Sequence, residues 1–403
     1  MTDAPRLGDT PDSDFLGFEL LLDDEDRKHL ERVRAFMTDQ VEPVINDYWT
    51  RAQFPHELVP GLAELGIAGL QFDGPGCPGR SSLLDGMTSM ELARVDPSIQ
   101  TFMGVHGGLA MGSVQLCGSD EQRERWLPAM ARMELIGAFG LTEPLEGSGI
   151  AGGLATTARR DGDDWILDGE KKWIGNASFA DLVVIWARDV EDGQVKGFVV
   201  EKDPGSEGGT EGMTFDVQRD KIALRVVQNA EIHLRGVRVP DSNRLGRASS
   251  FADTAKVLKV TRMGVAWAAT GCARGAYEHA LRYTGEREQF GKPIAGFQLV
   301  QDLLVKMLAN VVASTAMCVR VSQLQDAGLL KDEHASLAKA YTTSRMRETV
   351  GWAREVLGGN GILLEHHVGR FVADAEAIYS YEGTREINTL IVGRAITGRS
   401  AFV

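Results

Sequence analysis

The chain has 403 residues, too many for one small hydrophobic core, so we expect two or three packed domains. Hydrophobic residues make up 43% of it and charged residues 25%, which are ordinary globular values and argue against global disorder. The formal net charge of -14 at pH 7 disfavours a nucleic acid or an anionic membrane as partner, because both bind basic surfaces.

The sequence carries no sign of export or of a membrane anchor. The first 23 residues are acidic and resemble neither a signal peptide nor an Arg-rich transit peptide. No uninterrupted apolar run reaches the roughly 18 residues that span a bilayer. The four cysteines lie far apart without a CxxC pair, as expected of free thiols in a reducing compartment. We therefore expect a cytoplasmic protein with neither a membrane nor a nucleic acid as partner.

The first part of the chain, from Leu30 to Gly140, has a helical pattern. Apolar residues recur at spacings of three and four after an acidic turn at 23–26, which suits the positive end of a helix dipole. Prolines and the GPGCPG cluster at 74–79 divide the region into short helices and loops. The apolar stripe consists of Leu30, Val33, Met37 and Val41.

From about Ala155 the chain changes to short stretches rich in Thr, Trp, Val and Ile. Asp-Gly pairs at 161–162, 168–169 and 192–193 lie between such stretches, and this arrangement predicts hairpin turns. The last strand region is expected to run from Val226 to Val239 and to stop near Pro240. The pattern therefore predicts an antiparallel β domain.

Beyond Phe251 the sequence predicts long helices again. No Gly or Pro interrupts residues 297–327, and Gly328 is placed to end that helix. Another helix is expected from about Glu333 to Leu357, and such long helices usually pack as a bundle. The whole chain is thus an α+β multidomain protein with an N-terminal all-α domain at 1–136, an antiparallel β-sheet domain at 137–242 and a C-terminal four-helix bundle at 243–403.

Four segments together resemble the acyl-CoA dehydrogenase and oxidase family, and their order and spacing make the resemblance specific. They are FGLTEP at 139–144 with Gly147-Ser148, KWIGN at 172–176, REQFG at 287–291, and LGGNG at 357–361 followed by YEGT at 381–384. The likeness is strongest to the glutaryl-CoA dehydrogenase branch and to plant short-chain acyl-CoA oxidases. The α, β and α domains of that family follow one another in the same order as the domains predicted here.

The resemblance implies an FAD-dependent enzyme, an oxidoreductase that acts on CH–CH bonds as in fatty-acid β-oxidation. It would convert a short-chain, uncharged acyl-CoA to the trans-2-enoyl-CoA. The same resemblance implies an electron-transfer flavoprotein as electron acceptor and a homotetramer as the assembly.

Glu382 is the residue that the resemblance implies as the catalytic base. In the family, the glutamate of such a Tyr-Glu-Gly-Thr segment removes the α-proton, and a carboxylate in a water-poor pocket is a stronger base. Gly383 has no side chain, so a thioester can lie against its backbone. The Glu382 N–H and a flavin hydroxyl would polarise the thioester carbonyl.

Two segments resemble those that hold the flavin. In the first, backbone amides and the Thr142 hydroxyl would bind the ring edge, and Gly147-Ser148 would let phosphate approach. In the second, Trp173 would pack against the ring, but the family usually has Thr where this chain has Gly175. In the family this position lies near flavin N5, where hydride arrives and oxygen would react. The difference is therefore a sequence hint of an altered electron acceptor. The residues expected at the flavin in these segments are Phe139, Leu141, Thr142, Gly147, Ser148, Trp173, Ile174 and Gly175.

A further group resembles the residues that bind FAD across a subunit interface. Arg287 suits the pyrophosphate because its planar fork pairs with phosphate oxygens and keeps its charge. Gln298 is the second member of this group, and Glu355, Gly358, Gly359 and Thr384 would complete the cofactor shell from the partner subunit. Phe290 and Phe402 are also expected to bind the cofactor.

The resemblance implies that Ser148, Arg262, Gly383, Gln100 and Thr101 bind the substrate, with Arg262 near the catalytic carboxylate. Glutaryl-CoA dehydrogenases carry Arg, which pairs with the distal carboxylate, at the position of Gln100. A neutral amide cannot offset the desolvation of that carboxylate, so short, uncharged acyl-CoAs are the expected substrates.

Several alternatives remain open from the sequence. An acyl-CoA oxidase would pass the electrons to oxygen, and a glutaryl-CoA dehydrogenase would take the charged substrate. A non-catalytic acyl-CoA- or flavin-binding relative is disfavoured by the intact Glu382, Arg262 and Arg287, and a flavin monooxygenase would not need the base. No metal site is expected, because Glu365-His366-His367 is not a zinc motif and the Glu-x-x-His pairs of di-iron bundles are missing.

Overall fold

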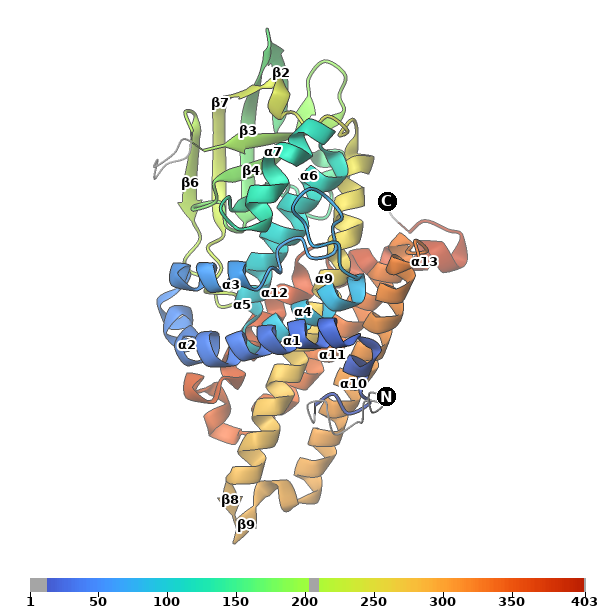
Figure 1. Ribbon diagram of the computed structural model, residues 1–403. Coiled ribbons are helices and arrows are strands. Elements are labelled where there is room, and N and C mark those ends of the chain that lie inside the picture. Colours follow the sequence, from blue (N-terminus) through green and yellow to red (C-terminus); the bar gives the residue numbers. More distant parts are fainter. Residues whose placement is uncertain (1–12, 203–209, 402–403) are drawn as a thin grey trace.

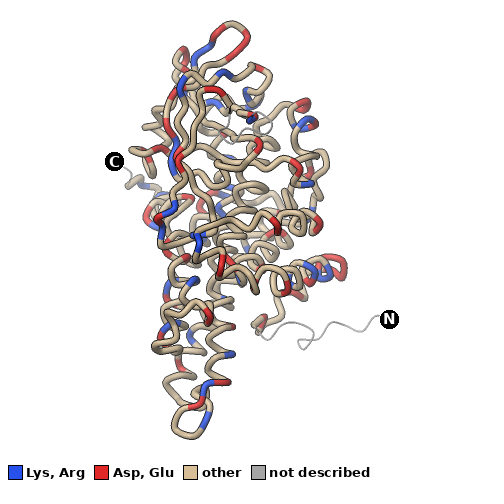
Figure 2. The backbone as a smooth tube through the Cα atoms, turned by 90° about the vertical axis from the view of Figure 1, so that its left-hand side faces the viewer, with Lys and Arg blue, Asp and Glu red and all other residues tan. Residues whose placement is uncertain are grey.

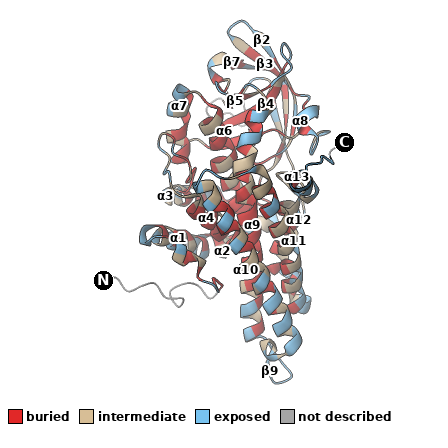
Figure 3. Ribbon diagram, turned by 90° about the vertical axis from the view of Figure 1, so that its right-hand side faces the viewer, coloured by how far each residue is buried: buried red, intermediate tan, exposed pale blue. Residues whose placement is uncertain are grey.

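The computed structural model describes residues 13–202 and 210–401. Figure 1 shows an elongated molecule in which the sheet lies at one end and a pair of long helices extends to the other. Shorter helices lie between these two ends, and the burial colouring of Figure 3 places the largest buried region there. In Figure 2, Lys and Arg are interspersed with Asp and Glu rather than gathered on one face.

The N-terminal region is helical, as the sequence predicts. The stripe of Leu30, Val33, Met37 and Val41 is fully buried, and the Asp23 side chain caps the first helix by accepting the Asp26 N–H. Two single π-type turns, η3 and η5, interrupt the helices. The elements are η2 (Phe18–Leu21), α1 (Asp24–Phe36), η3 (Met37–Val41), α2 (Glu42–Arg51), η4 (His56–Leu58), α3 (Val59–Glu64), α4 (Ser82–Val95), α5 (Pro97–Met103), η5 (Gly104–Ala110), α6 (Met111–Cys117) and α7 (Asp120–Ala131).

A single seven-stranded sheet forms the middle region. Its order is β1-β4-β2-β3-β7-β6, with β5 paired to β4. Most pairings are antiparallel as predicted, but β1 and β2 each pair in parallel with β4. The elements are β1 (Gly137–Gly140), α8 (Ile150–Gly153), β2 (Thr157–Asp161), β3 (Asp164–Ile174), β4 (Leu182–Asp189), β5 (Val195–Glu201), β6 (Met213–Val217), β7 (Ala230–Pro240) and η6 (Asp241–Asn243).

Two of the three predicted Asp-Gly hairpins are confirmed, and the third is wrong. The turns at 161–162 and 192–193 connect β2 to β3 and β4 to β5. Asp168-Gly169 instead lies inside β3, where the register with β7 shifts. Gly169 has φ of 147°, and a Cβ there would lie 2.6 Å from Thr156 Oγ1. The glycine is therefore needed for a bulge that passes close to a neighbouring segment.

The C-terminal region is a bundle of α9 to α12, with α13 against α11. The predicted helix at 297–327 is α10, and Gly328 ends it with a left-handed φ of 68°. By length and composition α10 could cross a membrane, although less than half of its most apolar stretch is buried in this structure. The elements are α9 (Phe251–Glu286), β8 (Glu288–Gln289), β9 (Lys292–Pro293), η7 (Ile294–Gly296), α10 (Gln298–Asp326), α11 (Asp332–Val356), η8 (Gly358–Ile362), η9 (Leu364–His366), α12 (Val368–Ser380) and α13 (Arg385–Thr397).

The helical regions are joined by a buried ion pair between Arg370 on α12 and Asp96, which precedes α5. Neither side chain is exposed to solvent. Arg370 also donates to Asn46 Oδ1 at 2.8 Å and to the Val95 carbonyl at 3.2 Å. The Asp96 carboxylate in turn caps α5 by accepting the Ser98 N–H at 2.9 Å. One guanidinium therefore fixes the start of α5 relative to the C-terminal bundle.

Replacing Arg370 with Met should lower the free energy of unfolding by about 3–5 kcal/mol, because it leaves the buried Asp96 carboxylate without its partner. Arg238→Met is the matched control, since Arg238 pairs with Asp161 and Asp164 on the exposed face of the sheet. Urea unfolding of the two variants measures the difference. Equal midpoints for both variants would show that the Arg370 pair does not hold these regions together.

Candidate active site

The predicted base lies in a tight turn, Tyr381–Thr384, between α12 and α13. Glu382 and Gly383 both have left-handed backbones, with φ of 50° and 83°. Thr384 then starts α13, because its hydroxyl accepts the Ile387 N–H at 3.3 Å. A left-handed conformation is unfavourable for a glutamate, so the surrounding structure must hold it, and such strain is typical of functional sites.

The Glu382 carboxyl lies among groups from α9 and α11. Burial raises its pKa, while the Lys339 ammonium, a hydrogen bond from Thr261 and the Arg262 guanidinium oppose that rise. Its Oε2 is buried and has no hydrogen-bond partner among the described residues. A buried carboxylate oxygen without a partner is rare in proteins and marks a place where a ligand group can bind.

Lys339 supports this turn from α11, and sequence reasoning did not identify it. The side chain is fully buried, and its ammonium donates to the carbonyl oxygens of Tyr381 and Gly383. Burial lowers the pKa of Lys339 to about 7, against the attraction of the Glu382 carboxylate. The sequence did hold a signal, because Lys339 lies on the same helical face as Ala335 and Thr342, on a buried stripe.

Arg262 lies near Glu382, as predicted, but its charge is engaged elsewhere. Its Nη1 pairs with Asp332 on α11 and donates to Ser336 Oγ at 3.0 Å. The guanidinium Nε is buried without a partner among the described residues. Because a carboxylate already offsets its charge, Arg262 acts on Glu382 less directly than Lys339 does.

Gln100 and Thr101, two of the predicted substrate contacts, lie on α5. Thr101 Oγ1 is 3.5 Å from the Tyr381 hydroxyl, and Gln100 Nε2 donates to Ser89 Oγ at 3.0 Å. Thr101 therefore lies next to the turn that carries Glu382, whereas Gln100 faces Ser89 on α4, and contact of either residue with an acyl chain stays a prediction.

The π-type turn η5 connects these residues to the sheet. A Cβ added to Gly104 would lie 3.5 Å from Gln100 Nε2, and one added to Gly108 would lie 3.4 Å from Thr261 Cγ2. Val105 lies on the other side, with its Cγ2 3.2 Å from a Cβ added to Gly175. Such turns are frequent at functional sites, and no local pattern in the sequence pointed to this one.

The two predicted flavin segments lie together on the sheet. Phe139, Leu141 and Ile174 are buried, and the Thr142 carbonyl accepts the Lys172 N–H at 2.8 Å, which brings the segments side by side. Gly175, next to Val105, connects them to η5.

The surface of these segments fits a flat ring system that carries phosphates. Trp173 has φ of 65° and an indole that is 55% exposed, so a large apolar ring is presented to solvent at a strained position. Gly147 and Ser148 are exposed, and a Cβ on Gly147 would meet nothing within 4 Å, so the backbone is open to a ligand. These features suit the isoalloxazine and the pyrophosphate of FAD.

Most of the remaining predicted cofactor residues lie away from Glu382, toward the other end of the bundle. Phe290 is 94% exposed on the short β8–β9 hairpin, which Figures 1 and 3 place farthest from the sheet. Arg262 lies on α9, and Arg287 directly follows the end of this helix. The two are 25 residues apart, which corresponds to about 38 Å at the rise of an α-helix. One chain therefore does not bring this group to Glu382. The exposed members are Arg287, Phe290, Gln298, Glu355, Gly358 and Gly359, whereas Thr384 lies beside Glu382 and Phe402 is outside the described residues.

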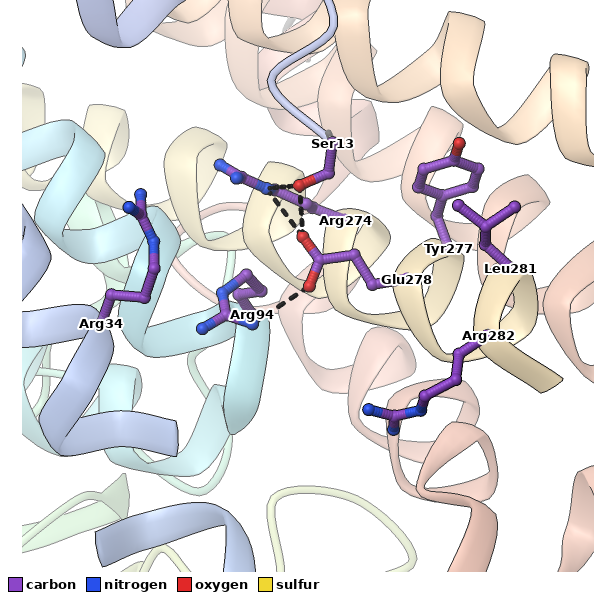
Figure 4. A pocket seen from close by; sticks show the side chains of 8 residues that line it. All are labelled: Ser13, Arg34, Arg94, Arg274, Tyr277, Glu278, Leu281 and Arg282. Atoms are coloured by element: carbon purple, nitrogen blue, oxygen red, sulfur yellow. Dashed lines mark hydrogen bonds and ion pairs between the residues drawn. The ribbon is translucent and has the colours of Figure 1, made fainter. Parts of the chain in front are cut away.

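A cavity of about 330 Å³ near the N-terminal end of the described chain is a separate feature (Figure 4). Arg34, Arg94 and Arg274 surround it and pair with the buried Glu91 at 3.1, 2.8 and 3.3 Å. These arginines outweigh the effect of burial and hold the pKa of Glu91 well below its usual value. The cations are therefore already paired, and the cluster joins α1, α4 and α9.

A second cavity, of about 440 Å³, borders Arg287 and contains His279 and His367. These histidines and Glu42 are close enough together to suggest a metal site. The two imidazoles, however, stack with centroids 4.6 Å apart and planes only 11° from parallel. Their lone pairs lie in those planes and cannot converge on one ion, so the geometry does not support a metal.

Sequence models of three acyl-CoA dehydrogenase domains match the chain in order. The N-terminal domain matches residues 23–134, the middle domain 138–237 and the C-terminal domain 251–397. Together they account for most of its length.

Known proteins resemble the chain over nearly its whole length. A glutaryl-CoA dehydrogenase structure from Mycobacterium smegmatis is 40% identical with a TM-score of 0.92, covering 97% of this chain and 99% of that one. A glutaryl-CoA dehydrogenase structure from the same organism in complex with FADH2 is 35% identical, with a TM-score of 0.92 and coverage of 96% and 98%.

Among curated proteins, a 3-(aryl)acrylate reductase of Clostridium sporogenes is 32% identical, covering 89% of this chain and 95% of its own. The subunit CarC of the caffeyl-CoA reductase-Etf complex of Acetobacterium woodii is 30% identical, covering 87% and 92%. The matches, the three-domain fold and the flavin segments agree: the chain belongs to the acyl-CoA dehydrogenase family, FAD flavoproteins that are oxidoreductases acting on CH–CH bonds.

Proposed function

We propose that the protein removes the α and β hydrogens of a short-chain, uncharged acyl-CoA and forms the trans-2-enoyl-CoA, with Glu382 as the base. The observation that supports this most is the unpartnered, buried Glu382 Oε2 on a strained turn beside the Lys339 cation. A carboxylate whose pKa is raised by burial takes up a proton more readily, which suits the α-proton of a thioester.

In this proposal Glu382 forms an O–H bond as the Cα–H bond of the substrate breaks. Bound FAD supplies the acceptor for the β-hydrogen, which leaves with its electron pair. The Glu382 N–H donates to the thioester carbonyl and stabilises the negative charge that develops there. Gly383 leaves room for the thioester against the backbone, and Trp173, Thr142 and Gly147 would hold the flavin.

Changing Glu382 to Gln should lower turnover by at least about 10²-fold and leave FAD content and acyl-CoA binding nearly intact, because the amide keeps the size but cannot accept the proton. Anaerobic stopped-flow bleaching of the flavin with butyryl-CoA measures the rate. Glu286→Gln, on the exposed end of α9, is the matched control. If the Glu382 variant bleaches at nearly the rate of the unchanged enzyme, another group is the base.

The uncharged substrate is proposed from the surroundings of Gln100. Gln100 is buried and donates to Ser89 Oγ, and Ser89 in turn donates to the Gly264 carbonyl at 3.4 Å. All these partners are neutral, so they offer no opposite charge to a buried carboxylate. The likeness to glutaryl-CoA dehydrogenases favours the charged substrate, and the chemistry at Gln100 favours the neutral one.

The kcat/KM for butyryl-CoA should exceed that for glutaryl-CoA by about tenfold to a hundredfold. This ratio corresponds to the loss of about 1.5–3 kcal/mol that is expected when a buried charge has no partner. Steady-state assays with one artificial electron acceptor compare the two. Equal use of glutaryl-CoA, with release of carbon dioxide and crotonyl-CoA, would contradict the inference from Gln100.

An electron-transfer flavoprotein is the proposed electron acceptor, and the rival is molecular oxygen in an acyl-CoA oxidase. Val105 lies 3.2 Å from where a Cβ on Gly175 would be, so this side chain fills part of the space that the glycine leaves. An open path for oxygen beside the flavin is therefore not favoured. The CarC relative, named as part of an Etf complex, supports the same choice. Admitting air to butyryl-CoA-reduced enzyme tests it, because an oxidase would regain its yellow colour within the turnover time.

A homotetramer is proposed because, within one chain, much of the length of α9 separates the group around Arg287 from the groups near Glu382 and the flavin segments. Phe290 and Leu299 are 94% and 82% exposed beside Arg287, and Val305 extends the exposed apolar surface along α10. A second copy that covers this surface would bring Arg287 to the flavin of its neighbour.

Changing Arg287 to Ala should therefore reduce FAD retention and loosen the assembly together, since one guanidinium serves both the phosphates and the interface. Flavin absorbance and light-scattering mass after gel filtration measure the two effects. Arg320→Ala, an exposed arginine on α10, is the control. Fully flavinated protein of unchanged mass would show that Arg287 is an ordinary surface residue.

A further inference from the structure

We propose that Lys339 is a positioning residue for the reaction: it fixes the turn that presents Glu382 and places a positive charge near the Glu382 carboxylate. This inference rests on the proposed role of Glu382 as base and adds a second residue, from another helix, to that role.

The geometry places Lys339 behind the turn rather than in contact with the reacting atoms. Its ammonium donates to the carbonyl oxygens of Tyr381 and Gly383, the two neighbours of Glu382 in the chain. Asn388 on α13 donates to the same Gly383 carbonyl at 2.8 Å and to the Thr384 carbonyl at 3.0 Å. Groups from two helices thus hold Glu382 and Gly383 in their left-handed conformations. A glutamate without such support would leave this conformation.

Among the described residues, the carboxylates that attract the Lys339 ammonium are those of Glu382 and Glu386. Its two hydrogen-bond acceptors are neutral carbonyls, and a lysine ammonium has three donors, so one remains. Arg262 differs, because Asp332 already pairs with its guanidinium. Lys339 is therefore the cation that favours the ionised form of Glu382 most strongly.

The surrounding charges determine the sign of the pH dependence. Lys339 faces Glu382 in the turn, Arg262 on α9 and Glu386 on α13, and its pKa is lowered to about 7, chiefly by burial. The pKa of Glu382 is raised by burial, and Lys339 is the first group that opposes the rise. Removing the ammonium removes this attraction, so the pKa of Glu382 rises further and the base becomes ionised only at higher pH.

The test uses flavin-loaded enzyme carrying Lys339→Met, which removes the charge and the donors, or Lys339→Gln, which removes the charge but keeps one donor. Lys196→Met is the control, because Lys196 pairs with Asp189 and Asp192 in the β4–β5 hairpin. One readout is the pH profile of flavin bleaching by butyryl-CoA.

The second readout does not depend on flavin reduction. It is exchange of the α-hydrogens of 3,3-dimethylbutyryl-CoA in D2O, followed by mass spectrometry, since this thioester has no β-hydrogen to transfer. Exchange requires only that a base removes the α-proton and that a deuteron returns.

In both Lys339 variants we expect the rising limb of the pH profile to shift to higher pH by at least about one unit. This is the smallest pKa change expected when a nearby opposite charge is removed. Exchange at about pH 6, where the Lys339 side chain is mostly protonated, should fall by about tenfold while KM changes little. The Lys196 variant should keep the profile of the unchanged enzyme. Lys339→Gln keeps the test open if Lys339→Met does not fold.

A lower rate with an unmoved rising limb in a folded, flavinated variant would overturn the proposal, because Lys339 would then hold the turn without acting on the charge of Glu382. An unchanged rate and limb would overturn it as well. Failure of the proposed base is distinguishable, because Glu382→Gln would then still exchange the α-hydrogens at the rate of the unchanged enzyme.

Discussion

The close contact between α4 and α9 is the constraint on which the site depends. A Cβ on Gly271 would lie 2.2 Å from the Met90 carbonyl oxygen, and one on Gly275 would lie 2.0 Å from that of Arg94. Only glycine allows two helix backbones to approach so closely. The helix α9 then carries Thr261 and Arg262 to the site, while α4 carries Ser89 and leads into α5. The close approach of these two helices therefore sets how Thr261 and Arg262 lie relative to Ser89 and the start of α5.

The fold was predictable wherever its signal was local. The stripe of Leu30 to Val41 and the stop at Gly328 depend on neighbours within one or two helical turns, and the structure confirms both. Asp168-Gly169 has the same local appearance as the two true hairpin turns, but its bulge depends on Thr156, which comes from a neighbouring segment. The parallel pairings of β1 and β2 with β4 also depend on long-range topology, which alternation along one strand does not encode.

The candidate site shows the same division. The segments at Glu382 and at 139–144 and 172–176 could be found in the sequence, because each is a short contiguous motif, and their roles as base and flavin site stay predictions. The partner of Arg262 is Asp332, 70 residues farther on, and no spacing rule connects them. Lys339 lies on a buried stripe of α11, where a charged residue conflicts with the pattern, so that conflict was the available signal. The sequence could also not show that α9 keeps Arg287 about 38 Å from Arg262.

A base of this kind has to satisfy two opposing demands. Burial raises the pKa of Glu382 and would strengthen it as the proposed base, but the same burial favours the protonated form, which cannot accept a proton. A nearby cation restores the ionised form, at the cost of burying a second charge, which disfavours folding. Lys339 limits that cost by donating to two carbonyls of the turn itself, so the group that supplies the charge also fixes the backbone of the base. An apolar residue at this position would suit the stripe on α11 better, and the lysine is therefore best explained by what it does for Glu382.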